Sequence, residues 1–132
     1  MAEDSRWKRV LVVEHNPDVR EALATLLRDV GHLVAEAGTG PEALAHLRSN
    51  PVTDVVLLAL ELPVMDGWTF RMEQSLDPRI AGIPVAALGE PQPEDPRAGN
   101  VFFNRYFPKP LHLRLLLDYV AEARRLDLSG LP

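Results

Sequence analysis

The sequence predicts an α/β protein in which helices cover both faces of a doubly wound, five-stranded parallel sheet. The main observation is that apolar runs of strand length alternate with segments whose apolar residues recur at helical spacing. A second observation is composition: 46% of the residues are hydrophobic and 25% are charged, as in an ordinary globular protein. A chain of 132 residues is also long enough to bury the core of one domain.

The five predicted strands are short runs rich in apolar residues. The third of them is apolar throughout, as expected for a strand that is buried on both faces of a sheet. The runs are Val10 to Val13, Leu33 to Glu36, Val55 to Ala59, Ile83 to Leu88 and Phe102 to Phe107.

The first predicted helix follows the first strand and has clear signals at both ends. Asn16 can cap its first turn, Pro17 fits the first helical position, and Gly31 can end it. Its apolar stripe consists of Val19, Leu23, Leu26, Leu27 and Val30.

Two further helices are predicted before the fourth strand. Thr39 and Glu42 have the spacing of a capping box, and the helix that they begin buries Ala43, Leu44 and Leu47. The next helix follows Asp66 and Gly67, and it ends before Pro78 because the residue before a proline avoids the helical region. We expect its apolar side to carry Trp68, Met72 and Leu76.

The segment between the fourth and fifth strands interrupts the pattern. Pro91, Pro93 and Pro96 fall within six positions, and each removes an amide donor and disfavours a helical residue before it. We therefore expect the helix between these strands to be missing or much reduced. About a dozen residues still suffice for a parallel crossover, so the sheet can continue.

The last predicted helix runs from about Leu111 to Arg124 and has two apolar stripes, which is more than one core contact needs. Either both stripes pack on the sheet and its helices, or the second stripe meets a partner. The main stripe is Leu113, Leu116, Leu117 and Val120; the second is Leu111, Leu115 and Tyr119.

Charge and composition narrow the classes of function. A net charge of -5 argues against a nucleic-acid footprint, which needs clustered lysine and arginine. Without cysteine the chain has neither a disulfide nor a thiolate metal site, and it has no apolar stretch that suits a signal peptide or a membrane span. We expect a cytoplasmic domain over residues 9–125, with a tail at 1–8 and a tail or truncated linker at 126–132.

Three features together resemble a response-regulator receiver domain over residues 9 to about 125. They are Glu14 after the first apolar strand, the segment Leu62-Pro63-Val64-Met65-Asp66-Gly67, and Pro108-Lys109-Pro110. The resemblance implies a flavodoxin-like sheet of strand order 2-1-3-4-5 and a place in two-component signal transduction. It also suggests that the Lys109-Pro110 bond is cis.

The resemblance further implies a chemistry that this chain does not keep. Similar receivers accept a phosphoryl group on an aspartate at the end of strand three. They are aided by Mg²⁺, an acidic pair after strand one, a hydroxyl after strand four and a lysine after strand five. Here the acidic pair becomes Glu14 and His15, the acceptor becomes Ala59, the hydroxyl becomes Gly89, and Lys109 is unchanged. We therefore predict a degenerate pocket with no catalytic activity, no bound metal and no cofactor.

Three alternative interpretations of the pocket are less favourable. An engineered knock-out at Ala59 would leave the remaining positions intact, whereas His15 and Gly89 also depart from the pattern.

Asp54 lies too far up the strand to replace the acceptor, and Glu61 is more simply an exposed loop acid. A transition-metal site at His15 and Glu14 would have two ligands only, because His32, His46 and His112 fall on separate elements.

Two side-chain arrangements follow. Without an acceptor, Glu14 and Lys109 remain as opposite charges at one edge of the sheet, so we expect them to approach each other directly or through water. Tyr106 occupies the place where similar receivers keep a mobile aromatic ring. Because Gly89 leaves space beside it, we expect the ring to rest inward; the alternative is a ring at the surface or on the last helix.

The function predicted from these residues is that of a pseudo-receiver, a phosphorylation-independent module for protein interaction or dimerisation. We expect the partner, most simply a second copy, to bind across strand four, strand five and the last helix, with no role for nucleic acid or membrane. A phosphorelay receiver with a non-standard acceptor and a small-ligand sensor are the alternatives, although no glycine-rich phosphate loop follows strand one. The expected interface residues are Tyr106, Phe102, Phe103, Leu111, Leu115 and Tyr119, with core packing of the two phenylalanines as the simpler interpretation.

Overall fold

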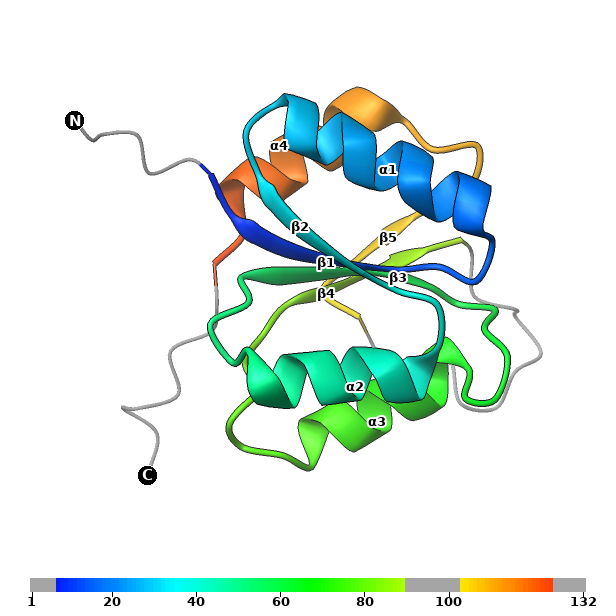
Figure 1. The fold of residues 1–132 in the computed structure, drawn as a ribbon, viewed down its shortest axis with the longest axis vertical. Helices are drawn as coiled ribbons and strands as arrows, with labels where there is room; N and C mark the ends of the chain where they lie inside the picture. Colours follow the sequence, from blue (N-terminus) through cyan, green and yellow to red (C-terminus); the bar gives the residue numbers. More distant parts are fainter. Residues whose placement is uncertain (1–6, 90–102, 125–132) are drawn as a thin grey trace.

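A computed structural model describes residues 7–89 and 103–124 and shows a parallel sheet between two layers of helices (Figure 1). Helices α1 and α4 cover one face, and α2 and α3 cover the other. The elements are β1 (Arg9–Val13), α1 (Pro17–Asp29), β2 (Leu33–Ala37), α2 (Gly40–Ser49), β3 (Val55–Ala59), α3 (Gly67–Ser75), β4 (Val85–Leu88), β5 (Arg105–Phe107) and α4 (Leu113–Glu122).

The sheet has the order β2-β1-β3-β4-β5 and every neighbouring pair is parallel, which confirms the predicted fold class. Val13 pairs with Leu58, Ala59 pairs with Leu88, and Leu88 pairs with Phe107. Because the strands are parallel and in this register, β1, β3, β4 and β5 all end at one edge of the sheet. Every residue of β3 is buried, as predicted, and every residue of β4 is buried as well.

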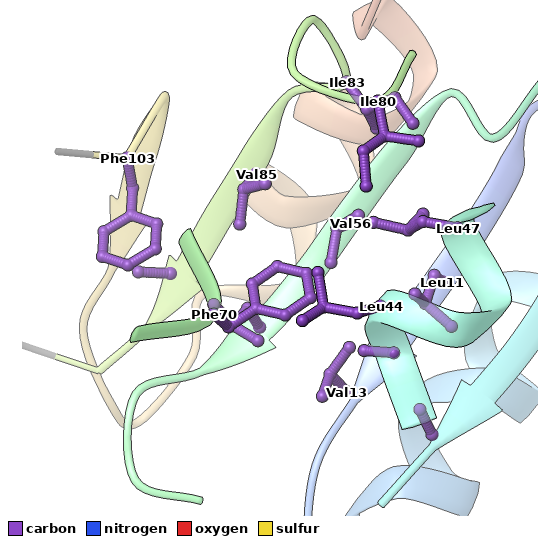
Figure 2. Close-up of a cluster of buried hydrophobic side chains, with 14 of the residues drawn as sticks. Leu11, Val13, Leu44, Leu47, Val56, Phe70, Ile80, Ile83, Val85 and Phe103 are labelled. Carbon is purple, nitrogen blue, oxygen red and sulfur yellow. The ribbon is translucent and has the colours of Figure 1, made fainter. Parts of the chain in front are cut away.

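The apolar side chains form one core layer on each face of the sheet. The layer under α2 and α3 includes Phe70 and Phe103 together with leucines and valines of the sheet and of α2 (Figure 2). The layer under α1 and α4 includes Leu23, Leu27, Leu116 and Val120. No helix within residues 7–89 and 103–124 is long and apolar enough to cross a membrane.

The first two helices begin where the sequence predicts. The Asn16 side chain accepts hydrogen bonds from the backbone N–H groups of Asp18 (2.9 Å) and Val19 (3.2 Å). The Thr39 hydroxyl accepts from the N–H of Glu42 at 3.2 Å. The Glu42 carboxylate accepts in return from Gly38, one residue earlier than the standard capping box, so both ends of this reciprocal cap are satisfied.

The third helix corrects one prediction. Asp66 caps it by accepting from the N–H of Thr69 at 2.9 Å, and Trp68 is buried, but Met72 and Leu76 are 50% and 76% exposed. Residues four apart drift by about 40° around a helix, so this stripe turns away from the sheet after one step. The side that faces the core carries Gly67, Phe70 and Gln74 instead.

The strands next to the interrupted segment begin later than predicted. Ile83 is buried, but β4 begins only at Val85, after Pro84, and β5 begins at Arg105 rather than at residue 102. The Asn104 side chain accepts the N–H of Val85 at 2.8 Å, and the Asn104 N–H donates to the Val85 carbonyl at 2.9 Å. The Asn104 side chain thus accepts a hydrogen bond from β4 at the position just before β5 begins. The expected loss of a helix before β5 falls within residues 90–102, outside the described residues.

In the last helix, each of the two predicted apolar stripes contains both buried and exposed residues. Leu116 and Val120 are fully buried, whereas Leu113 is 47% exposed. From the second stripe, Tyr119 packs on the core with its ring centroid 5.6 Å from that of Phe107, and Leu111 packs partly on the same core. Leu115 is 45% exposed, so one residue of the second stripe remains available to a partner.

Candidate functional site

The carboxyl edge of the sheet gathers the residues that the sequence selects as a degenerate pocket. Glu14 follows β1, Ala59 ends β3, Gly89 follows β4, and Lys109 follows β5 by two residues. The fold alone produces this gathering, because parallel strands present their carboxyl ends together. What the edge can do chemically depends on these four residues.

Ala59 offers no reactive atom at the centre of this edge. It is the last residue of β3 and only 3% exposed. The start of α3 lies directly against it: the Gly67 N–H donates to the Leu60 carbonyl at 3.0 Å, and a Cβ at Gly67 would lie 3.2 Å from the Ala59 carbonyl oxygen. The end of β3 is therefore closely covered by backbone.

Gly89 lacks a hydroxyl and also has a backbone conformation that disfavours one. Its φ of 125° lies in the region that L residues rarely adopt, and its N–H donates to the Phe107 carbonyl at 2.8 Å. A serine or threonine at this position would be strained unless the backbone changed. The departure at position 89 thus involves the local backbone as well as the side chain.

Glu14 is the buried carboxylate of the site, with 7% of the residue exposed. One of its oxygens, Oε2, accepts from the Asn16 N–H at 3.0 Å, and the other, Oε1, lies 3.8 Å from Nζ of Lys109. The predicted approach of these two charges is confirmed, as is the cis Lys109-Pro110 bond. The pair is unequal, because the Lys109 side chain is 54% exposed and that of Glu14 only 9%.

Arg20 is a neighbour of this site that the sequence reasoning missed. Its Nη1 donates to the Glu14 carbonyl at 3.0 Å, and its Nε lies 3.4 Å from the Glu36 carboxylate. It therefore fixes the backbone at the end of β1 from the first turn of α1. The sequence does contain a signal for this contact, because Arg20 lies one turn into the helix that follows Glu14.

Three further residues that the sequence analysis weighed as ligands or acceptors are His15, Glu61 and Asp54. His15 is exposed, and Glu61 is exposed beyond the end of β3. The Asp54 carboxylate accepts the N–H of Arg9 at 2.8 Å, at the opposite edge of the sheet. Within residues 7–89 and 103–124, no group of three or more histidine, aspartate or glutamate side chains could hold a metal ion.

An aromatic cluster connects β5 with α3 beside the site. The Phe103 ring lies 5.2 Å from that of Trp68 and 5.6 Å from that of Tyr106, in an edge-to-face arrangement with the tyrosine. Phe103 is 5% exposed and belongs to the core, so it is not part of an exposed interface as expected; the core interpretation applies to it. Phe102 lies outside the described residues.

Tyr106 is half-buried against the same core layer as Phe103, on the face covered by α2 and α3 rather than on α4. Burial raises the pKa of its hydroxyl. Trp68 completes this cluster, and sequence reasoning placed it only on a helix face. The sequence shows that Trp68, Phe103 and Tyr106 are aromatic, but only the fold brings their rings into contact.

The sheet order and the residues at its carboxyl edge define a receiver-like α/β domain. Residues 10–121 match the response regulator receiver domain family. The chain therefore belongs to that family, whose domains act in two-component signal transduction.

Individual relatives support this assignment. Response regulator receiver protein CpdR of Brucella abortus is 30% identical over 121 residues, which cover 87% of this chain and 95% of that protein. The gliding motility regulatory protein of Myxococcus xanthus is 35% identical over 92 residues, 69% of this chain and 12% of that protein. Chemotaxis response regulator CheY4 of Vibrio cholerae shares the fold with a TM-score of 0.76 and 27% identity, over 86% of this chain and 96% of that one.

Many of the relatives are larger proteins. For five of the curated relatives, the chain spans only 12% to 46% of their length. The activities of those whole proteins therefore describe combinations of domains.

Proposed function

We propose that this receiver domain is a phosphorylation-independent pseudo-receiver, which acts in signal transduction by binding protein. The observation that carries the proposal is the buried alanine at position 59, at the end of β3. Formation of an acyl phosphate needs a carboxylate oxygen as nucleophile. The methyl group of Ala59 has no such oxygen.

The nearby carboxylates are poorly placed to replace that nucleophile. Glu61 lies in the exposed loop after β3, and Asp54 lies at the other edge of the sheet. Glu14 is at the right edge, but its two oxygens face the Asn16 N–H and the Lys109 ammonium. These positions favour a domain that does not take up a phosphoryl group.

The residues present also fit Mg²⁺ poorly. This ion prefers octahedral oxygen ligands and loses its bound water reluctantly. Among the four pocket positions, Glu14 alone supplies a carboxylate, and the Lys109 ammonium lies 3.8 Å from one of its oxygens. A cation would therefore have to displace an existing positive charge for a single carboxylate.

The interaction face that we propose lies across β4, β5 and α4. Leu115 is exposed on α4, and Tyr119 is half-buried one turn further along the helix. Leu111 is half-buried just before α4 begins. The contact of Tyr119 with Phe107 places this stripe beside β5. A partly apolar surface of this kind suits a second copy or another protein, with exposed leucine and tyrosine as contact residues.

Tyr106 supports the idea that no phosphoryl trigger operates. Its ring already rests against Phe103, and position 89 carries no hydroxyl that could couple it to a phosphoryl group. We infer that the ring keeps this inward position without modification of the domain.

The phosphorylation-independent part is tested by chemical-shift mapping of the ¹⁵N-labelled domain with Mg²⁺ and beryllofluoride. We expect no saturable shifts at the amides of Glu14, Leu60 and Lys109. A receiver domain with an intact aspartate serves as the positive control. Saturable shifts confined to this edge would contradict the proposal.

The association part is tested by sedimentation velocity over a range of concentrations. We expect concentration-dependent self-association that Leu115→Glu weakens by about tenfold or more, because a charge enters the apolar contact. Met72→Glu, at a similarly exposed residue of α3, is the matched control and should leave association unchanged. A protein that stays monomeric throughout, or an equal effect of both variants, would argue against this face.

A further inference from the structure

Strand β2 forms one edge of the sheet, because the strand order is β2-β1-β3-β4-β5. Successive residues of a strand point their backbone N–H and C=O groups to opposite sides. The Leu33 N–H and the Ala37 carbonyl each form a 3.0 Å hydrogen bond with a residue that flanks β1. The first, third and fifth residues of β2 therefore bond toward β1, and the backbone groups of Val34 and Glu36 point outward.

This outer edge offers a mostly apolar strand to an incoming chain. Glu36 is the one charged residue among the five residues of β2. Leu33 is 55% exposed, and Val34 is half-buried. An exposed apolar edge strand pairs readily with another strand unless a side chain blocks it. Because β5 forms the opposite edge, this surface is separate from the proposed face across β4, β5 and α4.

Arg28, in the last turn of α1, blocks the outer edge of β2. Its Nη2 donates to the Val34 carbonyl at 2.9 Å and lies 3.2 Å from Oε2 of Glu36. Arg20, about two turns earlier on α1, holds Oε1 of the same glutamate at 3.4 Å. One outward carbonyl of β2 is therefore already occupied, and it is an acceptor that the N–H of an added strand would need.

The dipole of α1 explains a positive charge in its last turn, but not the contact with the strand. Arg48 occupies the last turn of α2 in the same way, and its ion pair is with Asp77, at 3.3 Å, in the loop before β4. An arginine at a helix end thus has no need of a strand carbonyl. The contact between Arg28 and Val34 follows from where α1 lies beside the edge.

We propose that the outer edge of β2 is a pairing surface for the same strand of a second copy, and that Arg28 keeps this surface closed. In an antiparallel pair centred on Ala35, Val34 of one copy lies opposite Glu36 of the other, and their outward groups complement each other. This register places each carboxylate opposite a valine, so no two carboxylates face each other directly. Main-chain hydrogen bonds would hold such a pair together, as in other cases of strand addition.

Sedimentation velocity over a range of concentrations tests the proposal. All variants carry Leu115→Glu, so that association through α4 does not contribute. Arg28→Ala should self-associate about tenfold or more tightly than the same domain with Arg28. Arg48→Ala, the matched control, should behave like the domain with both arginines. Urea unfolding checks that each variant is folded. Arg28→Gln, which loses the charge but keeps a good helix former, should behave like Arg28→Ala.

A proline at position 34 shows whether the association is strand pairing. Val34→Pro removes an outward N–H and no hydrogen bond to β1, and proline is tolerated on edge strands. Added to Arg28→Ala, it should return the domain to the sedimentation of the domain with Arg28. Amide hydrogen exchange locates the contact, because concentrated Arg28→Ala should protect the N–H groups of Val34 and Glu36 more than the dilute protein does.

Four results would overturn the proposal. The first is that Arg28→Ala and Arg28→Gln associate no more than the domain with Arg28. The second is an equal effect of Arg48→Ala. The third is association that persists with Val34→Pro, and the fourth is new amide protection that centres outside β2.

Discussion

At the scale of single residues, the pocket differs from an active receiver in charge as well as in chemistry. His15 and Ala59 stand where the receiver resemblance implies carboxylates. We propose that Glu14 is the remaining acid of the pocket, with Lys109, 3.8 Å away, as its counterion. Glu14 is buried, whereas Lys109 is half-exposed. Removal of Lys109 would therefore leave a buried carboxylate without a counterion, which costs stability.

The first prediction concerns this pair. Lys109→Ala should lower the free energy of unfolding by about 0.5 to 1 kcal/mol, a modest value because water screens the exposed lysine. In the background of Glu14→Gln, which keeps an acceptor for the Asn16 N–H, Lys109→Ala should cost almost nothing. Urea unfolding of the four proteins in this double-mutant cycle measures the coupling. Equal costs in both backgrounds would show that the two residues do not interact.

The second prediction concerns Val64, a β-branched residue with φ of 72° that is 88% exposed. The Met65 N–H donates to the Pro63 carbonyl at 2.7 Å, which closes a tight turn around it. Val64→Gly should raise the free energy of unfolding by about 0.5 to 1 kcal/mol, because the relieved strain exceeds the added chain entropy.

Val52→Gly is the matched control for this strain effect. Val52 is also an exposed loop valine, but its φ is not positive. This substitution should therefore lower stability in the same urea experiment. If both valine-to-glycine changes destabilised the domain equally, the strain at Val64 would not be energetically significant.

At the scale of elements, the predicted parts are those that local sequence determines, and the unpredicted parts depend on tertiary contacts. Asn16 and Thr39 cap their helices as expected because a cap needs neighbours only a few residues away. The core side of α3 was misjudged, since the identity of its inward residues depends on how the helix lies on the sheet. Gln74 was not selected at all, although it is fully buried.

The third prediction uses Gln74 as a test of that tertiary contact. Its Nε2 donates to the carbonyls of Ile80 (2.8 Å) and Ile83 (2.9 Å), which ties α3 to the loop before β4. Gln74→Leu should lower the free energy of unfolding by about 2 to 4 kcal/mol, because two buried carbonyls lose their donor. The same change at the exposed neighbour Glu73 should have little effect. A cost below about 1 kcal/mol would contradict this role of the glutamine.

The fourth prediction concerns pH and the junction of β1 with β2. Nδ1 of buried His32 accepts the Lys8 N–H at 2.9 Å, and burial together with the nearby Lys8 charge lowers the pKa of the imidazole. Burial also lowers the pKa of His46. Because the folded state prefers the neutral rings, their contribution is complete above the unfolded value of about 6.5 and is lost as the pH falls through the folded values.

Urea unfolding at pH 7.5 and pH 5 measures this dependence. The free energy of unfolding should fall toward pH 5 in the native sequence and should fall less in His32→Asn, whose side chain can accept the same hydrogen bond without titrating. His46→Asn should remove a further part of the difference. An unchanged pH dependence in both variants would assign the effect to other groups.

At the scale of the whole molecule, the fold is that of a receiver, and we propose that the residues at its carboxyl edge favour protein binding over phosphoryl transfer. The strand order followed from a resemblance carried by a few segments, and the gathering of Glu14, Ala59, Gly89 and Lys109 followed from that order. The positive-φ backbone at Gly89 and the groove between α1 and α4 could not be predicted, since both depend on how elements meet in space. The proposed interaction surface at β5 with α4 would let such a domain bind a partner.

The central claim is that the native chain has no phosphoryl acceptor, and intact-mass spectrometry after incubation with acetyl phosphate and Mg²⁺ tests it most directly. We expect the unmodified mass alone, under conditions in which a receiver with an intact aspartate gains one phosphoryl group. A stable adduct of that mass on the native chain would contradict the account.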